Sequence, residues 1–192
     1  MSLPQIQASV FIGTSLDGFI ARPDGTLDFL PPDGGEPHGY HEFFASVDAL
    51  VIGRATFETV LAFPEWPYGN KLVIVLSTRP LDLPKPGAPH VSPGLRDMGM
   101  RNVEQMSGDP KEIIERLSAR GIKHIYVDGG VTIQKFLRAG LIQRLIITRV
   151  PVLIGKGIPL FGELPRDVKL RHMETTAYAS GLVKSEYEVV QA

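Results

Sequence analysis

The stretch "YVDGGVTIQKFL", residues 126–137, combines an acid with bare backbone at a place where chemistry could occur. Asp128 ends an apolar run, and Gly129 and Gly130 follow it directly before a segment with helical spacing. Two adjacent glycines let a ligand approach the main chain closely. A helix that begins near Val131 would also present unpaired N–H groups and its positive dipole end to an anion. The alternative is a tight strand-to-helix connection without a ligand.

A second candidate place is "VIGRATFE", residues 51–58, where an apolar run ends at Gly53. Arg54 follows it, and a guanidinium group can bind a phosphate through two parallel hydrogen bonds. The hydroxyl of Thr56 falls in the first turn of the expected helix, close to backbone N–H groups that have no partner within the helix. Taken alone, Arg54 could equally be an ordinary surface residue.

The third candidate place is "VLSTRP", where Leu76 is followed by two hydroxyls and a cation: Ser77, Thr78 and Arg79. These residues could form a simple turn, but all three places follow strands that we expect in one sheet. Ligands of open α/β sheets bind at the carboxyl ends of the strands. The joint pattern therefore indicates a phosphate-bearing ligand, although neither a GxGxxG nor a GxxxxGK[ST] motif occurs.

The elements that must position these residues alternate along the chain. Apolar runs predict strands at about 6–13, 48–53, 71–76, 123–130 and 143–153, and helical spacing predicts helices at about 40–47, 54–63, 109–121 and 131–140. An Asp-Gly turn at 17–18, a long loop at 22–39 and at most an irregular strand near 90–91 complete this part. Two alternating stretches around Ser180-Gly181 predict a hairpin. The fold class is thus α/β, with a mixed, mostly parallel central sheet, flanking helices and a C-terminal antiparallel hairpin.

Composition excludes several classes of function. With 192 residues, of which 43% are hydrophobic, we expect a single domain with one core. A net charge of −1 predicts neither nucleic-acid nor membrane-surface binding. Without cysteine there are no disulfides, no thiolate nucleophile and none of the usual zinc sites, so no metal is expected. No apolar run approaches the roughly 18 residues of a membrane helix, and we expect a cytoplasmic protein.

The ordered motifs "SLDGFIA", "VIGRATFE", "KLVIVLSTRP", "IYVDGGVTIQKFL" and "LIITRVPVLIGKGIPLF" resemble the dihydrofolate reductase-like superfamily. The chain looks closest to the branch of the reductase domain of the bifunctional riboflavin-biosynthesis deaminase-reductase. The resemblance extends over about residues 6–190. It implies an NADPH-dependent oxidoreductase that binds its cofactor along the strand ends.

The resemblance also implies roles for particular residues. The adenosine phosphate and ribose of NADPH would be held around Gly53, Arg54, Thr56, Leu76, Ser77, Thr78 and Arg79. The pyrophosphate and nicotinamide would lie against Gly129, Gly130, Val131, Thr132 and Ile133, with Gly13, Ile20 and Ala21 beside the nicotinamide. Because members of this superfamily often have a cis peptide at the paired glycines, we expect one between Gly129 and Gly130.

The proton donor is less clear, because the position of the folate-type acid falls on Gly39 or Tyr40, which makes dihydrofolate a doubtful substrate. The resemblance favours Asp128 instead, because an acid precedes the paired glycines in the riboflavin-pathway reductases, and desolvation at a crowded strand end would raise its pKa. It could instead cap the following helix. Substrate contacts are expected from Asp28 and Glu42 and from the glycine-rich segment, which contains Gly155, Lys156, Gly157 and Phe161. The single tryptophan, Trp66, is expected at the surface.

The leading hypothesis is an NADPH-dependent reductase of a small heterocycle, such as an aminopyrimidine riboside or a pterin. One alternative is a dihydrofolate or pterin reductase of relaxed specificity. Another is a nucleotide-binding sensor without turnover, because a fold does not fix an activity. The alternating apolar residues of the last strands suggest a possible homodimer.

Overall fold

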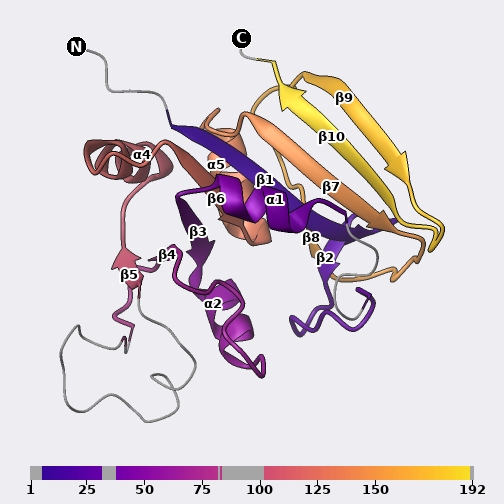
Figure 1. Ribbon diagram of the computed structural model, residues 1–192, viewed down its shortest axis with the longest axis horizontal. Helices are drawn as coiled ribbons and strands as arrows, with labels where there is room; N and C mark the ends of the chain where they lie inside the picture. The colour runs from indigo at the N-terminus through magenta and orange to yellow at the C-terminus, as the bar shows by residue number, and fades with distance from the viewer. Residues whose placement is uncertain (1–5, 32–37, 82, 84–101, 191–192) are drawn as a thin grey trace.

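A mixed sheet of eight strands forms the centre of the protein, as predicted (Figure 1). In this computed structural model the described residues are 6–31, 38–81, 83 and 102–190. The strand order is β5-β4-β3-β6-β1-β7-β10-β9. Neighbouring strands from β5 to β7 pair in parallel, whereas β10 pairs antiparallel with both β7 and β9. The strands are β1 (Gln7–Ser15), β3 (Ala49–Gly53), β4 (Leu72–Leu76), β5 (Val103–Met106), β6 (His124–Asp128), β7 (Arg144–Val150), β9 (Leu170–Ala177) and β10 (Val183–Val189).

Helices cover both faces of this sheet. Alternate residues of β3 enter different core clusters, since Ala49 and Val51 belong to one and Leu50 and Ile52 to the other. Successive side chains of a strand point to opposite faces, so the two clusters lie on opposite sides of the sheet. The first cluster includes residues of α4 (Pro110–Ala119) and α5 (Gly130–Arg138), and the second includes residues of α1 (Tyr40–Ser46) and α2 (Arg54–Leu61).

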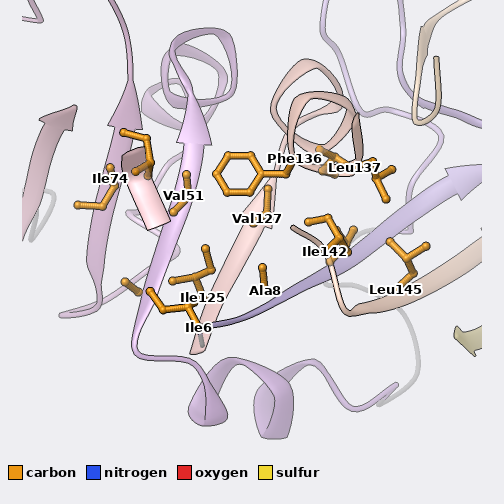
Figure 2. Packing of buried hydrophobic residues seen from close by; sticks show 14 of the residues in the cluster. Ile6, Ala8, Val51, Ile74, Ile125, Val127, Phe136, Leu137, Ile142 and Leu145 are labelled. Atoms are coloured by element: carbon orange, nitrogen blue, oxygen red, sulfur yellow. The ribbon is translucent and has the colours of Figure 1, made fainter. Parts of the chain in front are cut away.

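The first cluster fixes α5 against the strands that carry the candidate site. Figure 2 shows the ring of Phe136 pointing from the helix toward Val127, with Leu137 and Ile142 beside it. Phe136 is fully buried, and so is Val127 in the middle of β6. Burying an aromatic side chain of this size stabilises the fold by about 1.5–3 kcal/mol. The start of α5 is thereby held close to the end of β6.

Local signals in the sequence explain where several elements begin and end. Asp109 caps α4 through a capping box, in which Glu112 bonds back to the backbone N–H of Asp109. Gly181 has a φ of 88° in the turn between β9 and β10. The Asp17-Gly18 turn leads from β1 to the short β2 (Phe19–Ala21), which pairs with β8 (Ile158–Pro159). These features match the predicted helix start, hairpin and tight turn.

Other expectations were wrong or incomplete. Strands β5 and β8 were not predicted, and the irregular strand expected near 90–91 lies outside the described residues. Trp66 is not at the surface, because only 8% of it is exposed. Its ring meets Phe57 and Tyr68 edge to face, so it belongs to the second core cluster. Among the described residues, no helix is long and apolar enough to cross a membrane.

Candidate functional site

One pocket of about 500 Å³ opens where the parallel strands β1, β3, β4 and β6 end. The sheet supplies its floor, and α2, the start of α5 and the segment 25–30 surround it. Most of the expected cofactor residues line this pocket together with the candidate acid: Gly13, Ile20, Ala21, Gly53, Arg54, Thr56, Leu76, Asp128, Gly129, Gly130, Val131 and Thr132. Three strand ends that are distant in the sequence thus share one cavity.

Gly53 and Gly129 lie against side-chain hydroxyls that leave no room for a Cβ atom. Gly129 has a φ of 90°, and a Cβ there would collide with the hydroxyl of Thr56. A Cβ on Gly53 would lie 2.9 Å from the Thr132 hydroxyl oxygen. The expected cis peptide is wrong, because the bond between Gly129 and Gly130 is trans. The positive φ of Gly129 reverses the chain into α5 without one.

The N-terminus of α5 keeps its first N–H groups free of side-chain caps. Gly129 occupies the N-cap position and no side chain bonds there. The alternative role of Asp128 as a helix cap is therefore wrong. Its carboxylate Oδ1 instead accepts a hydrogen bond from the neighbouring N–H of Gly129, at 2.7 Å. The first turn of α5 consequently offers uncapped N–H groups at the wall of the pocket.

The carboxyl group of Asp128 is the most perturbed acid in the site. Burial raises its pKa from 3.8 to about 6, although the hydrogen bond from Gly129 acts in the opposite direction. Burial raises the pKa values of three neighbouring tyrosines, and the charge of Asp128 raises them further; these are Tyr40, Tyr68 and Tyr126. A carboxyl with a pKa close to neutrality can hold a proton and release it during a reaction.

Arg54 is tied to the segment after β4. Its guanidinium donates to Ser77 Oγ at 3.1 Å, to the carbonyls of Arg79 and Pro80 at 2.8 and 2.7 Å, and to Glu58 at 3.2 Å. These bonds occupy most of its five N–H donors. Arg54 therefore lines the pocket and at the same time fixes the backbone at residues 77–80.

Ser77, Thr78 and Arg79 themselves do not line the pocket. Ser77 is held in place, since its hydroxyl accepts from Arg54 and donates to the Arg79 carbonyl. Thr78 and Arg79 are exposed. No hydrogen bond or ion pair of the Arg79 guanidinium is found among the described residues, so this cation, directly beside the pocket residue Arg54, is available to a ligand.

Several expected contact residues lie outside the pocket. Ile133 is fully buried in the first core cluster. Asp28 is bound through both carboxylate oxygens by Arg22, and Glu42 lies exposed on α1. The segment with Gly155, Lys156 and Gly157 also lies outside the pocket, and the Asp17 carboxylate accepts hydrogen bonds from the N–H groups of Ile154 and Gly155 there. Phe161 does not line the pocket either.

Sequence reasoning missed the aromatic part of the lining. It comprises the rings of Phe11, Phe63, Tyr68 and Tyr126 with the aliphatic side chain of Val60 among them, all of which pack in or against the second core cluster. We call this set the aromatic wall. The alternation of β1 and β6 could have indicated Phe11 and Tyr126, because they lie two residues before Gly13 and Asp128 and so share their face. Nothing in the Pro-rich stretch around Tyr68 indicated a site residue.

Comparison with known proteins identifies the family of the chain. The family model of the RibD C-terminal domain matches residues 7–184. The uncharacterized protein YwjB of Bacillus subtilis is 32% identical over 176 residues, which is 90% of this chain and 92% of that protein. A putative riboflavin biosynthesis protein from Shewanella sp. PV-4 is 37% identical with a TM-score of 0.81, over 97% of this chain and all of that one.

More distant structures share the fold. The Thermotoga maritima diaminohydroxyphosphoribosylaminopyrimidine deaminase/5-amino-6-(5-phosphoribosylamino)uracil reductase has a TM-score of 0.74 at 14% identity, over 97% of this chain and 57% of that one. Dihydrofolate reductase from Enterococcus faecalis, complexed with NADP(H), has a TM-score of 0.59 at 20% identity, over 97% and 96% of the two chains. The dihydrofolate reductase-like fold class is thereby confirmed.

Proposed function

The chain belongs to the RibD C-terminal domain family, and from this premise we propose that it is an oxidoreductase that reduces a small heterocycle by hydride transfer from NADPH. The observation that carries the proposal is the position of Asp128. An acid with a raised pKa lies in the same pocket as a bare glycine pair and an uncapped helix N-terminus. Together they supply a proton and an anion-binding wall, which a nicotinamide-dependent reduction requires.

The residues present fit a phosphorylated dinucleotide. The absence of Cβ atoms at Gly53 and Gly129 brings the hydroxyls of Thr56 and Thr132 directly against the backbone. Hydroxyls and the N–H groups of the first turn of α5 would hold the pyrophosphate. Arg79, whose guanidinium has no partner among the described residues, would bind the phosphate on the adenosine ribose. Arg54 would orient that arginine through its bonds to the carbonyls of residues 79 and 80.

Bound NADPH would supply a hydride to an electrophilic carbon of the substrate and leave as NADP⁺. The chain's own contribution is the proton, which passes from the Asp128 carboxyl to the neighbouring nitrogen or oxygen of the same double bond. The N–H of Gly129 holds Oδ1 of this carboxyl in place, which leaves the second oxygen to face the substrate. The aromatic wall excludes water from that side of the ring.

A substrate of the folate type is less well supported. In dihydrofolate-reducing relatives we expect an acid on the helix that follows the long loop. Here Gly39 is the N-cap of α1 in a left-handed conformation and Tyr40 is its first residue. Glu42, the nearest acid on that helix, is exposed and does not line the pocket.

The test is loss of NADPH absorbance with a panel of aminopyrimidine ribosides, pterins and quinones, with wild type and two matched variants. Asp128→Asn should lower kcat by about 10²-fold or more, the usual contribution of a general acid, with dinucleotide affinity nearly unchanged. Asp167→Asn, an exposed acid outside the pocket, is the control and should keep wild-type turnover. Wild-type kcat/KM should fall as pH rises past about 6, because the donor loses its proton there. Unaltered turnover in Asp128→Asn would remove this residue from the mechanism.

A further inference from the structure

The pocket contains a cation, Lys135, whose charged end is open to a ligand. Among the residues that the structure describes, the lining has two cations, Arg54 and Lys135. The guanidinium of Arg54 donates to Ser77, to Glu58 and to two backbone carbonyls. For the Lys135 ammonium, by contrast, no hydrogen bond or ion pair is found within the described part of the chain. Lys135 is therefore the pocket cation that a ligand can engage.

The helical repeat places Lys135 on the side of α5 that faces the pocket. Phe136 and Leu137 are buried against the sheet, whereas Val131 is 62% exposed and Lys135 is exposed as well. Val131 and Lys135 are four residues apart, so they lie one above the other on the helix, and both line the pocket. Long side chains on a helix lean back toward its N-terminus. We therefore expect the Lys135 ammonium to reach over Val131 toward the first turn of α5.

Lys135 lies where the protein supplies little negative charge. A cation near a helix N-terminus meets the positive end of the helix dipole, which costs free energy. The one acid among the described lining residues is Asp128. Burial raises the pKa of Asp128 to about 6, and its Oδ1 already accepts the N–H of Gly129. An anionic ligand at the first turn of α5 would relieve the repulsion between this turn and Lys135.

Two helix N-termini meet at this end of the pocket. Thr56, in the first turn of α2, lies against Gly129, and Thr132, in the first turn of α5, lies against Gly53. Neither helix has a side-chain cap, so each offers backbone N–H groups that have no partner within the helix. A single phosphate can occupy one helix start, whereas a pyrophosphate has two neighbouring anionic groups and can occupy both. The arrangement favours a pyrophosphate with Lys135 beside it.

We propose that the Lys135 ammonium binds the pyrophosphate of the dinucleotide, and that it makes the site select a pyrophosphate over a single phosphate. This inference rests on the proposed function and adds to it a residue that distinguishes classes of nucleotide. The role differs from that of Arg79, which acts only on the phosphate of the adenosine ribose. Lys135 should contribute equally to the binding of NADPH and NADH, because both dinucleotides contain the pyrophosphate.

Equilibrium binding of ADP-ribose and AMP measures this selection directly, because only ADP-ribose contains a pyrophosphate. At slightly alkaline pH both ligands carry about two negative charges, so net charge alone does not separate them. Titration calorimetry of wild type should give at least about 10-fold tighter binding of ADP-ribose than of AMP. Lys135→Met keeps an apolar stem and removes the charge. It should weaken ADP-ribose about 10-fold or more, the loss of one charge-assisted hydrogen bond, and AMP by less than about 3-fold.

Two matched variants exclude an indirect effect. Lys135→Arg keeps the cation and should retain most of the preference for ADP-ribose. Lys111→Met removes an exposed lysine of α4 outside the pocket and should change neither affinity. Added salt should weaken ADP-ribose binding more in wild type than in Lys135→Met, because it screens the charge that this variant lacks.

Equal affinities of wild type for the two ligands, or an unchanged affinity for ADP-ribose in Lys135→Met, would overturn the inference. Turnover of NADPH in the same preparations tests the proposed function separately. If ADP-ribose binds through Lys135 but no heterocycle is reduced, the proposed function fails and the inference stands. If Lys135→Met oxidises NADPH and binds it with unchanged affinity, the inference fails and the proposed function stands.

Discussion

Asp128→Asn should make the protein more stable at neutral and alkaline pH while it abolishes most turnover. The reason lies in the free energy of ionising a buried carboxyl. The rise of its pKa from 3.8 to about 6 corresponds to about 3 kcal/mol of destabilisation once the group is charged. Asparagine is neutral at every pH and keeps an oxygen to accept the N–H of Gly129. Burial of its amide N–H groups offsets part of the gain, so about 1–3 kcal/mol should remain.

The difference in free energy of unfolding between the variant and wild type should change with pH in a defined direction. Below the unfolded pKa of 3.8 both folded and unfolded Asp128 are protonated, so the gain is absent there, and the variant should be less stable than wild type by the cost of burying its amide N–H groups. As pH rises from about 4 to 6 the unfolded state loses its proton first, and wild-type stability falls relative to the variant. Above about 6 the difference should be constant. The depressed pKa of His124 acts in the same pH range in both proteins, and it cancels in the comparison.

Urea unfolding of both proteins at several pH values measures this difference. Asp48→Asn is the matched control, because its carboxylate accepts the N–H groups of Lys123 and His124 and its pKa is lowered. That variant should be less stable than wild type at neutral pH, and the difference should vanish only as pH falls below 3.8. If Asp128→Asn is destabilised at pH 8, or its difference from wild type does not vary with pH, the description of Asp128 as a partly buried acid with a raised pKa is refuted.

Two further substitutions test the geometry of the site through urea unfolding. Gly129→Ala should lose more stability than Gly140→Ala, because both glycines have positive φ but a Cβ collides with Thr56 only at Gly129. The difference between the two losses should be of order 1–3 kcal/mol. Equal losses would mean that the clash with Thr56 relaxes freely. Tyr126→Phe should cost about 1–2 kcal/mol, because the buried carbonyl of Phe11 loses its donor; wild-type stability would mean that water replaces the hydroxyl.

The sequence was sufficient to predict the residues of the site that lie at the strand ends. Apolar runs ending in glycine, as at Gly53 and before Gly129, mark strand-to-helix turns, and parallel strands bring such turns to one edge. The family resemblance implied a cofactor contact for Ile133, but the helical repeat turns this residue toward the sheet with Phe136. The hydrogen bonds of Arg54 to residues 77–80 were not predicted, because they depend on loop geometry that no sequence repeat encodes.

Other elements could not be predicted from the sequence, for physical reasons. β5 has four residues, only one of which is buried, so it shows no alternation that could indicate a strand. Tyr68 and Trp66 come from a stretch with two prolines and a glycine, where composition predicts a solvated loop. Their burial arises from packing against Phe44 and Phe57 on two different helices. Such contacts between distant segments follow from the tertiary fold and have no local pattern.

The central claim is that the strand ends hold a phosphorylated dinucleotide, and the most direct test compares NADPH with NADH. Equilibrium titrations of wild type, Arg79→Ala and the control Arg166→Ala, an exposed cation outside this pocket, would measure both affinities. Wild type and the control should bind NADPH at least 10-fold more tightly than NADH, and Arg79→Ala should lose this preference while NADH binding is unchanged. Failure of wild type to bind either dinucleotide would contradict the account.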